Sequence, residues 1–409
     1  MKKNLPDGEW KGAIPGMFVC IEEFHSARNT AVRSGTRRRR GLQLFPLAVW
    51  LLVIASGGRI AGVLGAEPTS SQKRCAFIAF TNFAAFSQSA AGMTNETVMV
   101  SPEITAPVTW DELILSWDVS PGTHLKAEAR AFYADHTTRY YTMSVWSDDP
   151  GKFPRQSVRG QRDKDGSVKT DTLVLSNATR RLQIRLTVGG GSLPQALKFL
   201  GVSFCNSAIS PAVGQPNRAA WGKVIEVPER RQGEYPGGGG WCSPTSLSMV
   251  LAYWSEKLQR PELNHSVPET AAAIGDGVRG DTGNWPFNTA YAGQYPGIRA
   301  YVTRLEDISE LEDWIAAGIP VIISVSSYLT NDRTFGPDNG HLIVCVGFTE
   351  NGDVVTNDPG VSVRRNVRAR RTYAREKVIH AWKKSKNTVY LIYPESAKVP
   401  TDRFGHWAQ

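Results

Sequence analysis

The stretch YPGGGGWCSPTSLSMVLAYW, residues 235–254, changes from a glycine loop to a helix at a single cysteine, Cys242. From Pro244 onward its apolar residues recur with a helical period, so Cys242 lies directly before the predicted helix. A helix N-terminus carries unpaired N–H groups and about half a positive charge, which lowers the pKa of a nearby thiol. Because the thiolate is the nucleophilic form, this position makes Cys242 a candidate for acyl transfer. The alternative is a buried structural cysteine.

A histidine and an aspartate further along the chain are candidate partners for this thiol. His341 opens the strand-like run HLIVCVGF, and Asp358 ends the run DVVTND. The Asn351-Gly352 pair between the two runs is a strong hairpin signal, and pairing through that turn brings His341 and Asp358 together. An aspartate in this place can accept a hydrogen bond from the imidazole and hold its tautomer. The alternatives are a loop-end histidine and a turn-capping aspartate before Pro359.

The order Cys, His, Asp, with GWCSPTSLSMVL, GHLIVCVGF and NDPG, resembles the C39-like branch of papain-fold cysteine peptidases. That branch includes the domain that trims double-glycine leaders from bacteriocin precursors. The chain is more similar still to secreted bacterial proteins that join such a domain to an N-terminal β-rich region. The resemblance covers residues 226–394.

This resemblance implies a role for each of four residues. Cys242 would be the nucleophile, His341 the general base and acid, and Asp358 the residue that orients the histidine. The family also has an upstream glutamine whose amide stabilises the oxyanion. Gln232, ten residues before Cys242, is the candidate here, although a shorter spacing is more usual in the group. The geometric requirement is a side-chain amide about 3 Å from the developing oxyanion, with the Cys242 backbone N–H as second donor.

The pattern along the chain predicts an α+β domain, which the resemblance implies is papain-like, preceded by an all-β, sandwich-like domain. In the first half, the runs LILSWDV, HLKAEARAFY, RYYTMSVW, DTLVLS and RLQIRLTV alternate in the manner of strands between turn sequences. In the second half, a helix-like stretch at 308–317 and the strand-like run IPVIISVS precede the hairpin. The predicted divisions are a basic extension and signal or anchor at 1–66, the β-domain at 67–206, a linker at 207–220, the papain-like domain at 221–396 and a tail at 397–409.

The N-terminal segment resembles an export signal. Four arginines, 37–40, precede the apolar run LQLFPLAVWLLVIAS, and 15 residues suit the core of a signal peptide. Extending the run through residue 66 reaches membrane-spanning length, so an anchor at 42–66 is the alternative. We therefore expect a secreted or extracytoplasmic protein, with cell-envelope association as an option. Cys75 and Cys205 bracket the β-domain and are candidates for a disulfide formed after export.

Composition narrows the kinds of partner that the protein can have. A chain of 409 residues with 41% hydrophobic residues fits two globular domains plus extra segments. The net charge of +9 is clustered, with ten basic residues between Arg364 and Lys386, which argues against a nucleic-acid-binding surface over the whole molecule. This run would either steer an anionic partner or form the solvated face of a helix ending near Trp382. No cysteine or histidine cluster has zinc-ligand spacing, so neither a metal nor another cofactor is predicted.

These observations favour an exported cysteine hydrolase that cleaves a peptide or protein substrate through a thioester acyl-enzyme. One alternative is a surface binding module with an inactive papain-like domain. Its aromatic residues would then line a carbohydrate platform, although their alternating spacing favours core packing; they are Trp110, Trp117, Tyr140, Tyr141 and Trp146. A second alternative is isopeptide cleavage or acyl transfer to an amine. The sequence defines neither the substrate nor the oligomeric state.

Overall fold

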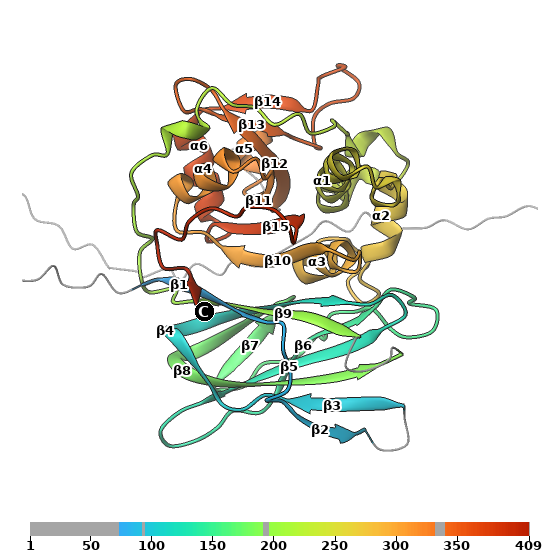
Figure 1. Ribbon diagram of the computed structural model, residues 1–409, viewed down its shortest axis with the longest axis vertical. Coiled ribbons are helices and arrows are strands. Elements are labelled where there is room, and N and C mark those ends of the chain that lie inside the picture. Colours follow the sequence, from blue (N-terminus) through green and yellow to red (C-terminus); the bar gives the residue numbers. More distant parts are fainter. Residues whose placement is uncertain (1–72, 92–94, 191–195, 332–339, 409) are drawn as a thin grey trace, which may run out of the picture. The chain divides into compact units, whose positions relative to one another are not determined.

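Two β-sheets organise the chain in the computed structural model, which describes residues 73–408 without 92–94, 191–195 and 332–339 (Figure 1). All of these residues belong to one compact unit. The predicted signal or anchor at 42–66 and its preceding arginines lie outside the described residues. Within the described part, no helix has the length and apolar character needed to span a membrane.

The N-terminal sheet has ten strands, with β16, β1, β9, β4, β8, β3 and β2 in order across it, while β5 and β7 also pair with β8 and β6 pairs with β5. The region is all-β, as predicted. The strands are β1 (Cys75–Phe80), β2 (Ser87–Ala90), β3 (Glu96–Val100), β4 (Ile104–Val119), β5 (His124–Phe132), β6 (Tyr141–Ser147), β7 (Gly166–Lys169), β8 (Thr172–Gly189), β9 (Leu197–Cys205) and β16 (Trp407–Ala408).

One strand differs from the prediction. The runs DTLVLS and RLQIRLTV, expected as two strands, form the single 18-residue strand β8. No glycine or proline separates the two runs, so nothing in the backbone requires a turn between them. One edge of β8 pairs with β4 and β3, and the other pairs with β7 and β5. This long strand therefore joins all the N-terminal strands into one hydrogen-bonded sheet.

The C-terminal sheet has six strands in the order β10-β15-β11-β12-β13-β14. Helix α1 lies on one side of this sheet and α4 and α6 lie on the other (Figure 1). The strands are β10 (Ile298–Arg304), β11 (Val321–Val325), β12 (His341–Phe348), β13 (Val354–Asn357), β14 (Arg370–Tyr373) and β15 (Thr388–Pro394). The helices are α1 (Cys242–Leu258), α2 (Val267–Ile274), α3 (Trp285–Gly293), α4 (Ile308–Ala316), α5 (Tyr328–Asn331) and α6 (Arg375–Lys383).

The predicted hairpin is present and brings the candidate residues to one end of the sheet. Strands β12 and β13 pair antiparallel from Phe348 opposite Val354 at the turn to Val344 opposite Asn357. Gly352 has a φ of 83°, a conformation that favours glycine, which explains the turn signal. Helix α1 is held against β12 by a hydrogen bond of 3.0 Å from the Ser246 hydroxyl to the Leu342 carbonyl.

The last described strand connects the predicted tail to the N-terminal sheet. Strand β16 pairs parallel with β1, with Phe77 opposite Trp407. The segment predicted as a linker also packs against the second half of the chain, because the Gly214 and Asn217 amides donate to Asp307 and Glu312. Buried apolar side chains from both sheets form one continuous cluster. Trp110, Trp117, Tyr141 and Trp146 are buried in it, which confirms core packing for four of the five aromatic residues, whereas Tyr140 is half-exposed.

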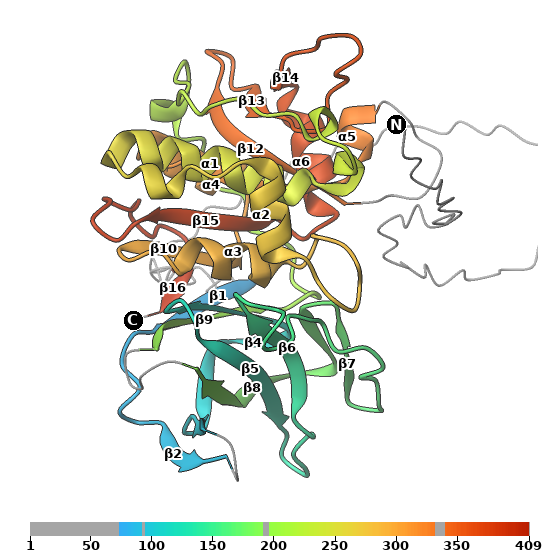
Figure 2. The ribbon, with the colours of Figure 1, turned by 90° about the vertical axis from the view of Figure 1, so that its right-hand side faces the viewer.

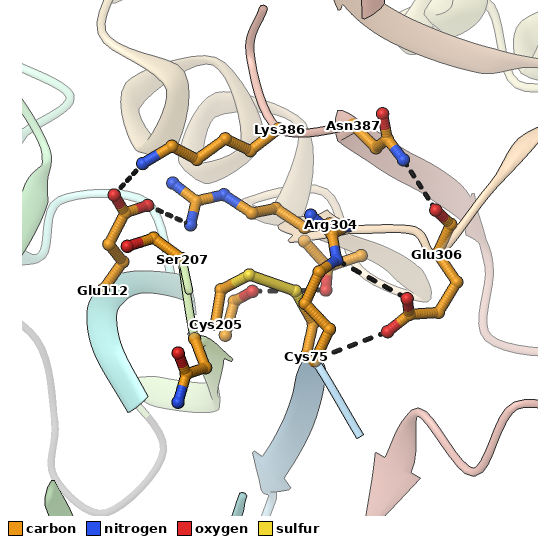
Figure 3. The surroundings of a disulfide bond; sticks show 12 residues. Cys75, Glu112, Cys205, Ser207, Arg304, Glu306, Lys386 and Asn387 are labelled. Carbon is orange, nitrogen blue, oxygen red and sulfur yellow. Dashed lines mark hydrogen bonds and ion pairs between the residues drawn. A yellow bond between two sulfur atoms is a disulfide. The ribbon is translucent and has the colours of Figure 1, made fainter. Parts of the chain in front are cut away.

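The predicted disulfide joins Cys75 and Cys205, which lie opposite each other on β1 and β9 with 4.2 Å between their Cα atoms (Figure 3). Charged side chains from both halves of the chain surround it. The Cys75 amide donates to the Glu306 carboxylate over 3.3 Å. Glu112, beside Cys205 in the sheet, forms ion pairs with Arg304 and Lys386 (Figure 3). The disulfide therefore lies where the two sheets meet.

Removing this disulfide should lower the free energy of unfolding substantially. The two cysteines are 130 residues apart, so the bond removes much of the freedom of the unfolded chain. We expect Cys75→Ala with Cys205→Ala to cost about 2–5 kcal/mol, measured by denaturant unfolding. A reducing agent should lower the melting temperature of the wild type and leave that of the double variant unchanged. Equal effects of the reducing agent on both proteins would contradict the prediction.

Candidate active site

Cys242 is the first residue of α1, and the residue as a whole is partly exposed. The preceding Trp241 provides no side-chain cap, and the first turn has no acidic residue, so the positive helix end is not neutralised locally. Cys345 is the second free cysteine of the described chain, and it lies buried within β12. Burial raises the pKa of the Cys345 thiol to about 12, which makes it a poor nucleophile.

His341 is the first residue of β12 and is 8% exposed. Its Nε2 lies 2.8 Å from Oδ1 of Asp358. With Nε2 held in this way, Nδ1 is the ring nitrogen that remains for Cys242. The histidine and the thiol are close enough for each to alter the pKa of the other. The structure thus brings three of the four predicted site residues together.

Asp358 is 1% exposed and accepts hydrogen bonds on both carboxylate oxygens. Oδ1 accepts from the Gly360 amide over 2.8 Å as well as from His341. Oδ2 accepts from the Tyr373 hydroxyl over 2.7 Å. These donors leave the carboxylate little freedom to rotate, so it can hold the imidazole in one orientation.

The pKa shifts of the three groups favour a charged pair. Burial raises the pKa of the Cys242 thiol, but His341 and the backbone amides of Leu342 and Ser243 outweigh it, and the net direction is downward. Burial lowers the pKa of His341, whereas Asp358 and the thiolate raise it, to about 10 overall. Burial likewise opposes ionisation of Asp358, but the neighbouring imidazolium and its hydrogen bonds lower the pKa of its carboxyl. The net shift of each group therefore favours its charged form, a thiolate beside an imidazolium and a carboxylate.

Gln232, the predicted oxyanion donor, is held on the loop that precedes α1. Its backbone amide donates to the Pro359 carbonyl over 3.0 Å, and its side-chain Nε2 donates to the Gly239 carbonyl over 2.9 Å. Within the described chain, its amide makes no hydrogen bond to the thiol, the imidazole or the carboxylate of the other three residues. An amide nitrogen carries two hydrogens, so a second N–H of Gln232 remains for another acceptor.

Two residues near Asp358 were missed by the sequence interpretation. A Cβ added to Gly360 would lie 2.9 Å from Cε1 and 3.1 Å from Nε2 of His341, so this position needs glycine for the ring to pack. Gly360 belongs to the NDPG segment, where the close approach of a ring could not be foreseen. Tyr373 ends β14 opposite Val354 of β13, and its hydroxyl reaches Asp358, which directly follows β13. The sequence gives no signal for this contact, because it depends on the pairing of β14 with β13 in the folded sheet.

The basic run from Arg364 to Lys386 divides into a loop, β14 and α6. Helix α6 ends at Lys383, close to the expected end near Trp382. Arg368 forms an ion pair with Glu229, and Arg375 forms one with the buried Glu312. Much of the remaining charge is exposed to solvent. Binding of an anionic partner stays a prediction.

Two families match this chain. Residues 224–390 match the Peptidase_C39 like family, and residues 83–200 match the Peptidase C39 N-terminal domain. The first match contains all four predicted site residues. A crystal structure described as a C39-like peptidase from Bacillus anthracis is 23% identical and covers 43% of this chain and 99% of that chain, with a TM-score of 0.33. No curated protein matches the chain.

Replacing Gly360 by alanine should displace the His341 ring and slow alkylation of Cys242. A small misplacement of a catalytic group can cost up to about 100-fold in rate, and we expect a loss of about 10- to 100-fold near pH 7. Gly340→Ala is the matched control, because a Cβ there meets no atom within 4 Å although the residue directly precedes His341. Mass spectrometry of the peptide that contains Cys242 measures the rate. Similar rates for the two variants would argue against the packing constraint.

Tyr373→Phe should move the acid limit of Cys242 reactivity to higher pH. The tyrosine hydroxyl lowers the pKa of Asp358, so its loss raises that pKa, and the carboxylate that supports the imidazolium is then protonated earlier as pH falls. A hydrogen bond to a charged group corresponds to a shift of about one pH unit. Tyr393→Phe, which removes a hydroxyl contact with Tyr301 over 3.0 Å, is the control and should leave the profile unchanged. Coincident profiles for Tyr373→Phe and the wild type would refute this role.

Proposed function

Because residues 224–390 belong to the Peptidase_C39 like family and follow a Peptidase C39 N-terminal domain, we propose that this protein is a cysteine peptidase using Cys242, His341 and Asp358. The observation that carries the proposal is the hydrogen bond of 2.8 Å between His341 and Asp358 beside a thiol at a helix start. Burial alone would keep the thiol protonated, yet the pKa of Cys242 is lowered by this partner. A thiol whose pKa is lowered in this way can act as the nucleophile in acyl transfer.

The reaction proceeds in two stages through a thioester. The Cys242 thiolate attacks the carbonyl carbon of an amide bond, and the carbonyl electron pair moves to oxygen. When the tetrahedral intermediate collapses, the C–N bond breaks, and the departing amine takes a proton from Nδ1 of His341. Water then attacks the thioester carbonyl, and His341 accepts a proton from this water. When the second tetrahedral intermediate collapses, the C–S bond breaks. The carboxylic acid is released and the Cys242 thiolate is regenerated.

The oxyanion of each tetrahedral intermediate requires hydrogen-bond donors. The backbone N–H of Cys242 is one proposed donor, since it belongs to the uncapped first turn of α1. The second N–H of the Gln232 amide is the other. The hydrogen bond from Gln232 to Gly239, three residues before the nucleophile, supports this role because it fixes the amide on the adjoining loop. A donor of this kind typically contributes about 10²–10³-fold to the rate.

Export to an oxidising compartment forms part of the proposal. The arginines 37–40 and the apolar run after them favour export, with anchoring through residues 42–66 as the alternative. The disulfide between Cys75 and Cys205 supports an extracytoplasmic location, because such bonds persist mainly outside reducing compartments. The substrate would then be a peptide or protein met outside the cytoplasm.

Incubation of the purified full chain with a diverse peptide library, read by mass spectrometry, tests the peptidase. New carboxyl and amino ends should appear with the wild type and disappear with Cys242→Ala. Cys345→Ala is the control, because that thiol is buried and its raised pKa makes it unreactive. Products joined to added amines would instead indicate acyl transfer. Identical products from the wild type and Cys242→Ala would refute catalysis by this cysteine.

The pH dependence tests the proposed charged pair. The lowered pKa of Cys242 should preserve alkylation below pH ~8.5, where an ordinary thiol loses its thiolate. Hydrolysis should decline on the alkaline side near pH 10, where His341 loses the proton that it gives to the leaving amine. His341→Ala should return the alkylation profile to that of an ordinary or buried thiol. An unchanged profile in that variant would exclude activation by His341.

A further inference from the structure

Two connections between strands of the N-terminal domain contact a segment that is hydrogen-bonded on both sides of the candidate nucleophile. This segment, residues 276–288, enters and begins α3, which lies between the two sheets (Figure 2). Two buried residues of the N-terminal half bind it. Ser157 contacts Asp276 and Asn284, and the Asp171 carboxylate accepts from the Trp285 amide over 2.9 Å.

Ser157 anchors the loop before α3 at two points. Its backbone amide donates to Oδ2 of Asp276 over 3.0 Å, and its hydroxyl donates to the same oxygen. The other oxygen of Asp276 accepts from the amides of Val278 and Arg279, each over 3.0 Å, which shapes the turn. The Ser157 hydroxyl in turn accepts from Nδ2 of Asn284 over 3.0 Å. Ser157, Asp276 and Asn284 are all at most 3% exposed, so water cannot replace these bonds at low cost.

Asn284 connects the Ser157 contacts, through Asn288, to Ser243, the residue next to Cys242. Its side-chain oxygen caps α3, and its backbone carbonyl accepts from Nδ2 of Asn288 over 2.8 Å. Oδ1 of Asn288 accepts from the hydroxyl of Ser243 over 2.8 Å. Ser243 directly follows Cys242 in the first turn of α1. A continuous series of buried hydrogen bonds thus runs from Ser157 in the N-terminal half to the nucleophile turn.

A second contact from the same segment reaches the other flank of Cys242. The Thr282 hydroxyl donates to the carbonyl of Gly240, two residues before the cysteine, over 3.3 Å. Nδ2 of Asn288 also donates to the Thr282 carbonyl over 3.2 Å. The segment therefore holds both the glycine loop and the helix start between which Cys242 lies.

We propose that the N-terminal domain is a positioning part of the active site, and that Ser157 in the β6–β7 connection and Asp171 in the β7–β8 turn set the geometry of Cys242 through residues 276–288. The proposal rests on Cys242 being the nucleophile. It gives the N-terminal domain a role within the enzyme itself and needs no external ligand for that domain. Neither residue touches the reacting atoms, so both are positioning residues.

If these bonds only stabilised the fold, their loss would lower the melting temperature without changing the reactivity of Cys242. A second buried serine between the N-terminal sheet and the C-terminal sheet provides the matched comparison. The Ser116 hydroxyl accepts from the Val302 amide over 2.9 Å, and this bond is as buried as those of Ser157. It joins β4 to β10 and, in the described chain, makes no hydrogen bond to residues 276–288. Val302 pairs in the sheet with Tyr390, whose hydroxyl lies 2.9 Å from that of Ser243, so this route to the nucleophile turn runs through the backbone of the C-terminal sheet. Ser116→Ala and Ser157→Ala therefore make the same chemical change at the same interface, and only the second interrupts the series that ends at Ser243.

The experiment measures alkylation of Cys242 in the full chain with iodoacetamide as a function of pH, together with the melting temperature. We expect Ser157→Ala to slow alkylation by about 10-fold or more near pH 7 and to move its midpoint to higher pH. Ser157→Thr, which keeps the hydroxyl, should restore most of the rate. Ser116→Ala should lower the melting temperature comparably and leave the alkylation profile unchanged. If Ser157→Ala does not fold, Asp171→Asn, which keeps the side-chain volume, is the replacement test variant and should slow alkylation in the same way.

The outcomes separate this inference from the proposed function. If Ser157→Ala and Asp171→Asn alkylate like Ser116→Ala while wild-type Cys242 has a lowered pKa, the positioning role is wrong and the activated nucleophile stands. If wild-type Cys242 itself reacts as an ordinary thiol, the proposed function fails instead. A selective loss in Ser157→Ala that Ser157→Thr restores supports the inference.

Discussion

Burial of the Asp358 charge is the constraint on which the arrangement of the site depends. An ionised carboxylate removed from water costs several kcal/mol unless it is paired and hydrogen-bonded. The donors come from three parts of the chain, namely the start of β12, the backbone after β13 and the end of β14. Those segments must meet at one point for the carboxylate to be stable. The same meeting point places the imidazole beside α1, so the stability of the charge and the activation of Cys242 have a common origin.

The boundary between the two sheets is also held by buried charges. Glu112 forms ion pairs with Arg304 of β10 and with Lys386, and Arg299 of β10 donates a hydrogen bond to Asp118 over 2.9 Å, so these contacts join the N-terminal sheet to the second half of the chain. Breaking a buried pair by removing one partner typically costs about 3–5 kcal/mol, because the remaining charge is left without compensation. Such contacts hold the sheets in a defined relation. That rigidity is what allows Ser157 to influence a residue as distant in sequence as Cys242.

Local signals in the sequence account for the parts of the fold that were predicted well. The Asn351-Gly352 turn specified the β12–β13 hairpin, and the helical period after Pro244 specified α1. Contacts between distant segments were not accessible in this way. The pairing of β14 with β13, which delivers Tyr373, and the interaction of Gly360 with the His341 ring depend on the assembled sheet. The sequence also predicted a break that is absent. The polar residues between the two strand-like runs suggested two strands, but the backbone continues through them as the single strand β8.

The parallel pairing of β16 with β1 bears on how the chain reaches its native state. Contacts between residues so distant in sequence carry a large loop-closure entropy and form slowly. The strand that covers β1 comes from around residue 407, so the outer edge of β1 stays unpaired until almost all of the described chain is available. An open edge of this kind is a site for pairing with other chains. For Phe77 and Ile78, the two residues of β1 that β16 pairs with, this exposure ends when the Trp407 segment docks.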